Sequence, residues 1–142
     1  MTKYYFSLRY GETIPAGSSV SRVISNVLRE IFPDKPFKIH QISILLRSNT
    51  NTGDLVIVYI ARNVGDFPSA STTPEAKAGL IKAFGFNKTE ADGTWQNLSE
   101  VVNYKPPLEF DKDDSLNIII SAGNTGASDR EVYFDLNLVV EA

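Results

Sequence analysis

The sequence has no cysteine among its 142 residues, and it has a single histidine and a single tryptophan. Without cysteine, disulfide bonds, thiolate chemistry and cysteine-bound zinc are excluded. One histidine, His40, is too few for a histidine-based zinc site, and any Ser-His-Asp catalysis would have to run through it. We therefore expect no enzyme, no metal site and no cofactor, and we interpret His40 as a half-buried structural side chain.

Long apolar runs and clustered positive charge are also missing. No stretch approaches the roughly 20 apolar residues of a membrane-spanning helix, and the first residues, MTKYYFSLRY, lack the features of a signal peptide. The net charge is −3, with +4 over residues 1–47 (seven basic, three acidic) and −7 over residues 48–142 (seven basic, fourteen acidic). Because the basic residues are scattered, we expect neither a membrane span nor direct contact with nucleic acid.

What the sequence does contain is the alternation of apolar and polar residues that half-buried strands show. One such pattern covers residues 4–10, and another ends the stretch SLNIIISAGNTGASDREVYFDLNLVVEA at residues 115–142. Its last part places five apolar residues in one phase: Val132, Phe134, Leu136, Leu138 and Val140. Exposing them would cost roughly 1.5–3 kcal/mol each, which rivals the stability of a whole domain. We predict a core strand here, the second of a closing hairpin.

Further strands are predicted over 36–48 and 54–62, on either side of the turn NTNTGD, in which Gly53 can adopt a positive φ. Together they predict another hairpin. Residues 54–62 are apolar in both phases, which is typical of a central strand covered on both sides or facing a partner. Polar loops are predicted over 63–77 and 87–94. Residues 78–86 fit a strand or a short helix, residues 95–104 fit a weak strand, and residues 105–114 fit an extended connection.

Residues 19–32, SVSRVISNVLREIF, fit two structures. Their apolar residues fall at helical spacing, which favours a short helix at about 20–32 that ends at Pro33. The many serines and β-branched residues instead fit an extended stretch. Either way the sequence predicts an all-β antiparallel β-sandwich of seven or eight strands in one domain, 1–142. With eight strands it is a jelly roll.

Few residues are candidates for a site. Trp95 is either a core residue or, with Tyr59, Tyr104 or Tyr133, part of an aromatic platform for a ligand or a subunit. The densest carboxylates, Asp111, Asp113 and Asp114, fit an exposed turn or a calcium site. Two further pairs have the composition of glycosidase acids but lie in no apolar setting that would raise a pKa: Glu90 with Asp92, and Glu109 with Asp111.

A family resemblance rests on the strand rhythm. The alternating first strand, the step IPAG into the next segment and the final pair DDSLNIIISAGNTGASDREVYFDLNLVVE resemble a single jelly-roll viral capsid or penton-type protein. The resemblance implies a structural protein of the virion and no active site. The basic N-terminal arm of many small capsid proteins is missing, which argues against direct genome contact.

Two functions therefore remain open from the sequence. The first is a self-associating capsid protein, a minor shell or vertex subunit located in the virion, with copies of itself and other virion proteins as partners. The alternative is a carbohydrate-binding β-sandwich module, which would be cytoplasmic in the absence of a virion. The alternative predicts that Trp95 is exposed, and a buried Trp95 would exclude the sugar platform.

Overall fold

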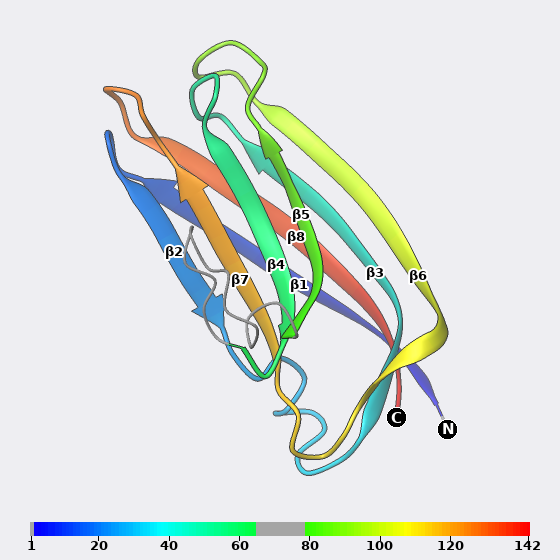
Figure 1. Cartoon of the computed structure of the whole chain (residues 1–142). Coiled ribbons are helices and arrows are strands. Elements are labelled where there is room, and N and C mark those ends of the chain that lie inside the picture. Colours follow the sequence, from blue (N-terminus) through cyan, green and yellow to red (C-terminus); the bar gives the residue numbers. More distant parts are fainter. Residues whose placement is uncertain (1, 65–78) are drawn as a thin grey trace.

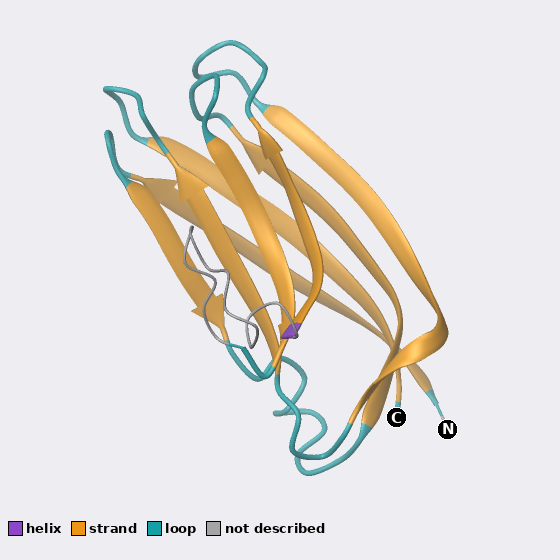
Figure 2. Ribbon diagram, in the orientation of Figure 1, coloured by secondary structure: helices purple, strands orange, loops and turns teal. Residues whose placement is uncertain are grey.

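Eight strands, arranged as two facing four-stranded sheets, make up the computed structural model, which describes residues 2–64 and 79–142 (Figure 1, Figure 2). The strands are β1 (Lys3–Ile14), β2 (Ser19–Ile24), β3 (Phe37–Ser48), β4 (Leu55–Arg62), β5 (Leu80–Asn87), β6 (Gln96–Phe110), β7 (Leu116–Gly123) and β8 (Arg130–Glu141). In the part of the chain described, no helix is long and apolar enough to cross a bilayer.

The strand order is β1-β8-β3-β6 in one sheet and β2-β7-β4-β5 in the other, and all neighbouring strands are antiparallel. Only the connection from β4 to β5 stays within a sheet, and every other connection crosses to the facing sheet. This is the order of an eight-stranded jelly roll, so the predicted all-β sandwich is confirmed.

Both predicted hairpins are wrong. β3 and β4 lie in different sheets, and so do β7 and β8, so neither pair shares a ladder of hydrogen bonds. The turns 49–54 and 124–129 instead connect one sheet to the other. Gly53 has a φ of 92°, which is positive as predicted. Strands that bury one face each can meet across the core as well as side by side, and the alternation is the same in both cases.

The helix predicted at about 20–32 is also wrong. Residues 19–24 form β2, and the following loop contains Asn26, Leu28 and Asp34 with positive φ, which no right-handed helix allows. The loop still buries Leu28 and Phe32 under the core. The Arg29 guanidinium holds this loop in place, because it donates to the backbone carbonyls of residues 32, 35, 111 and 114.

Two weaker predictions are now settled. Residues 78–86 were compatible with a strand or a helix, and Leu80–Asn87 forms β5. The weak strand predicted at 95–104 is too short, because β6 continues to Phe110 through the first part of the extended connection predicted at 105–114. Pro106 and Pro107 are tolerated there because β6 is the edge strand of its sheet. Most of the polar loop predicted at 63–77 lies outside the described residues.

The final strand lies inside the sheet, as predicted. β8 pairs with β1 on one side and with β3 on the other over nearly its whole length. Its five in-phase apolar side chains, Val132, Phe134, Leu136, Leu138 and Val140, are each at most 2% exposed. They pack in one hydrophobic core with side chains of the facing sheet such as Val58, Ile60, Phe84 and Ile118.

We expect Leu136→Ala to lower the free energy of unfolding by about 2–5 kcal/mol, because it leaves a cavity in a completely buried site. The matched control is Leu45→Ala, since Leu45 lies on the outer face of the neighbouring strand and is 36% exposed. The control should change the stability by no more than about 0.5 kcal/mol. Chemical denaturation followed by circular dichroism measures both, and similar losses in the two variants would contradict the central position of β8.

Candidate functional site

Four loops gather at one end of the sandwich, over residues 15–18, 49–54, 88–95 and 124–129 (Figure 1). A buried cation ties two of them together. Lys88 is 1% exposed, and its ammonium donates hydrogen bonds to the backbone carbonyls of Thr50 at 2.6 Å and Ala91 at 3.0 Å. Burial lowers the pKa of Lys88, and the carbonyls supply the partners that a buried charge requires.

Carboxylates at the same end join a third loop. Asp54 is 3% exposed, and its side chain accepts hydrogen bonds from the backbone N–H groups of Asn51 and Thr125. Asp92 accepts from the N–H of Thr52 at 2.8 Å. The loops 49–54, 88–95 and 124–129 therefore hold one another, so side chains mounted on them keep a fixed place.

An aromatic cluster lies beside this loop end, on the outer face of the β1-β8-β3-β6 sheet. Trp95, at the end of the loop 88–95, is 45% exposed, and its ring lies 5.7 Å from that of Tyr133 on β8, at 34°. The Arg47 guanidinium on β3 lies 5.7 Å from the Trp95 ring and 5.9 Å from the Tyr133 ring. Trp95, Tyr133 and Arg47 are called the aromatic cluster below.

Gly11 provides the seat for Tyr133. The two residues are cross-strand partners between β1 and β8, and a Cβ atom at Gly11 would clash with Tyr133 Cδ1. The ring therefore lies across the bare backbone of the edge strand, an arrangement known to stabilise strand glycines. A hydrogen bond with Glu131 raises the pKa of Tyr133.

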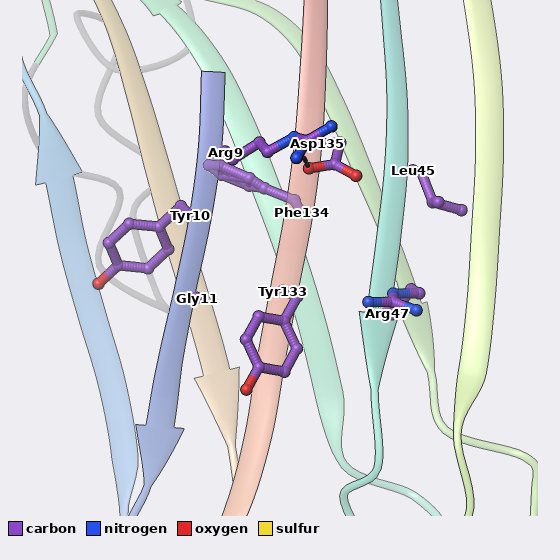
Figure 3. A pocket seen from close by; sticks show the side chains of 8 residues that line it. All are labelled: Arg9, Tyr10, Gly11, Leu45, Arg47, Tyr133, Phe134 and Asp135. Carbon is purple, nitrogen blue, oxygen red and sulfur yellow. Dashed lines mark ion pairs between the residues drawn. The ribbon is translucent and has the colours of Figure 1, made fainter. Parts of the chain in front are cut away.

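A surface groove of about 350 Å³ adjoins the aromatic cluster. Its outward-facing walls come from two rows of cross-strand neighbours, Gly11–Tyr133–Arg47 and Arg9–Asp135–Leu45 (Figure 3). Arg9 Nε lies 3.3 Å from Asp135 Oδ1, so this carboxylate is already paired. The guanidinium of Arg47 forms no ion pair with the described residues. The groove thus has an aromatic wall and one uncompensated positive charge.

Of the four aromatic residues singled out in the sequence, the structure brings Trp95 and Tyr133 together. Tyr59 lies on β4 of the other sheet, and Tyr104 points inward from β6 against the core, where burial raises its pKa. Sequence reasoning missed Arg47 and Gly11. Their places follow from the register, because Tyr133 pairs with Gly11 on one side and with Arg47 on the other.

Several of the other ionisable candidates form structural contacts. His40 lies at a β-bulge in β3, and its Nε2 is 2.9 Å from Glu141 Oε1. This hydrogen bond lowers the pKa of Glu141. In the proposed glycosidase pairs, Asp92 binds the backbone of Thr52, and Glu109 lies 3.7 Å from the Lys38 ammonium.

In the acidic turn at 111–114, the carboxylate of Asp114 has partners within the protein. Asp114 accepts hydrogen bonds of 2.8 Å from the Asn63 side chain and from the backbone N–H of Asp111, and Arg62 lies 3.8 Å away. These interactions, the Asn63 bond foremost, lower the pKa of Asp114. Within residues 2–64 and 79–142, no three histidine, cysteine or carboxylate side chains converge as a metal site would require.

We expect Asp114→Asn to remove a pH-dependent part of the stability. The depressed pKa means that this carboxylate stabilises the fold above its unfolded value of 3.8, and that the contribution disappears as the pH falls through the lower folded value. The stability difference between wild type and variant should therefore be largest near neutral pH and shrink in acid. Urea denaturation from neutral pH to about pH 2 measures it.

Asp113→Asn is the control, because Asp113 forms no hydrogen bond or ion pair with the described part of the chain. Its stability difference from the wild type should stay close to zero across the same pH range. A difference for Asp114→Asn that does not change with pH would show that the carboxylate charge contributes nothing.

A second surface lies on the flank where β1 and β2 form the edges of their sheets. An apolar groove of about 630 Å³ runs between β1 and the loop after β2, and is called the flank groove here. Its apolar lining consists of Leu8, Ile24, Val27, Leu28 and Ile31. Ile31 is 54% exposed, and Tyr4 and Val23 on the same edge strands are 39% and 41% exposed. Glu12 and Arg22 bridge the two edges at 2.8 Å.

Comparisons with known proteins find similarity only among solved structures, since no family model and no curated protein matches the sequence. Chains in structures of infectious bursal disease virus, strains Gt and Gx, match over 98% of this chain, at 12% and 9% identity and TM-scores of 0.36 and 0.32. A mutant VP2 protein of that virus, in derived T=1 particles, matches over 97% at 9% identity and a TM-score of 0.34. The chain spans about a third of their length, 32%, 36% and 35%.

Proposed function

We propose that this chain is a structural, self-associating capsid protein, a shell or vertex subunit of a virion, and not an enzyme. The observation that carries the proposal is the flank groove, an apolar surface that joins the open edges of both sheets of a jelly roll. Jelly rolls serve as shell subunits and as sugar-binding domains, among other roles. An apolar lateral edge favours the first role, because subunits of a shell must pack side by side.

The second copy of this chain is the occupant that fits the flank best. β1 is a 12-residue edge strand whose outer side has no strand partner among the described residues, so its backbone groups can pair with another strand. Beside it, Ile31, Tyr4 and Val23 expose large apolar side chains that a neighbouring subunit would cover. A two-fold contact would bring the same flank of both copies together, which closes the interface without leaving an open edge.

The proposed function also determines the location and the partners that we expect for this protein. We place the protein in the virion, in contact with copies of itself and with other virion proteins. The basic residues are scattered and the net charge is −3, so we do not assign it to contact with the genome.

We expect Ile31→Lys to disrupt self-association. Ile31 is 54% exposed in the isolated chain, so lysine there leaves the core intact but places a charge in the proposed interface. Sedimentation velocity should give a defined oligomer for the wild type and a shift toward the 15.7 kDa monomer for the variant. The association constant should fall at least about tenfold.

Leu55→Lys is the matched control, because Leu55 is 46% exposed on β4, away from the flank. It should assemble like the wild type. A wild-type protein that stays monomeric at about millimolar concentration would overturn the proposed function. An oligomer that withstands Ile31→Lys would overturn the assignment of the flank.

A further inference from the structure

We propose that the aromatic cluster and the adjoining groove bind a pyranose sugar that carries a carboxylate, such as a hexuronic acid unit of a glycan. This inference does not depend on the shell function, because the groove beside Tyr133 and the flank groove share no residue. It concerns a ligand that a monomer could bind as well as an assembly.

The exposed indole provides the surface for the sugar ring. Trp95 is the one tryptophan of the sequence, and a buried position would have satisfied its large apolar area better than the 45% exposure that it has. Tyr133 packs against it at 5.7 Å and extends the aromatic surface toward the groove. Flat apolar rings with polar rims are suited to the C–H face of a pyranose, while the rims meet its hydroxyl groups.

Arg47 gives the proposed site its preference for an acidic sugar. Arg9, Arg22 and Arg62 each have a carboxylate within 4 Å, at 3.3, 2.8 and 3.8 Å. Arg47 has none in the described part of the chain, and its guanidinium lies within cation–π distance of two aromatic rings instead. Contact with ring faces leaves the N–H groups of a guanidinium available for a two-point bond with a carboxylate.

The neighbouring groove determines where the rest of the sugar can lie. Its volume of about 350 Å³ is at the lower end of the range for small-ligand sites. Asp135 would repel an anion, but Arg9 neutralises it at 3.3 Å. The hydroxyl groups of the sugar can therefore reach Asp135 and Arg9, while the carboxylate meets Arg47.

The site is formed in advance, which reduces the entropy lost on binding. The loop that ends in Trp95 is fixed by the buried Lys88 ammonium and by Asp92. The Tyr133 ring lies over Gly11, in space that any larger side chain at position 11 would occupy. A single sugar ring offers little contact area, so it binds only where the protein loses little conformational entropy on binding.

The test uses two ligands that differ only in one group, glucuronic acid and glucose. Each is titrated into ¹⁵N-labelled full-length protein, and binding is followed by chemical-shift changes of the Trp95 indole and of the Arg47 and Tyr133 amides. We expect glucuronic acid to bind at least about tenfold more tightly than glucose, since the charge-assisted bond to Arg47 is made by the acid alone. The same spectra report whether each variant is folded.

Three variants assign the roles. Arg47→Gln should remove the preference for the acid and leave glucose unchanged, whereas Trp95→Ala should weaken both ligands. Gly11→Ala would displace the Tyr133 ring, so we expect both ligands to bind more weakly with the preference retained. Lys38→Gln, at the far end of the same outer face, removes a positive charge outside the site and should change neither affinity.

Equal affinities for glucuronic acid and glucose in the wild type would overturn the inference, and so would the absence of shifts at Trp95 with either ligand. A preference for the acid that survives Arg47→Gln would also overturn it, because general attraction to the protein would then be the cause. Self-association is measured separately, so either proposal can fail alone.

Discussion

The insertion of β8 between β1 and β3 is the constraint on which the rest of the structure depends. Each of its residues from 132 to 140 has a cross-strand partner on both sides, and its inward side chains fill the middle of the core. The first and last described strands are neighbours, so this sheet closes only when distant parts of the chain have met. Such pairing makes folding slow, because the entropy of closing a long loop is lost before the contacts between distant strands form.

The same strand builds the surface. Alternation sends Phe134 into the core and Tyr133 to the outer face, where Gly11 and Arg47 stand in the same row. The aromatic cluster is therefore positioned by the core of the protein and not by a flexible loop. Trp95, its one loop residue, comes from the end that the buried Lys88 ammonium fixes. Core and surface are coupled here, since a shift in the register of β8 would exchange Tyr133 with Phe134.

Alternation along the chain was enough to predict which residues face the core. Leu136 and its in-phase neighbours are buried as expected, and the β-sandwich of seven or eight strands follows from the number of alternating segments. It could not predict which strands are neighbours, since β3 and β4 bury their faces equally well across the core as they would in one sheet. The segment 19–32 was ambiguous because burying Leu28 and Phe32 suits a helix, and the structure buries them through a loop pinned by Arg29.

For the same reason, only half of the residues of the candidate site could be predicted from the sequence. Trp95 and Tyr133 attract attention by residue type alone, whereas Gly11 and Arg47 acquire a role only from the register. An arginine on the outer face of a strand is ordinary until two rings, and no described carboxylate, are found beside its guanidinium. Three arginines of this chain, Arg9, Arg22 and Arg62, have a carboxylate within 4 Å, and Arg47 does not among the described residues. Arg47 therefore keeps donor groups that an anionic ligand can use, and its charge is the feature by which the outer face differs from a merely solvated sheet.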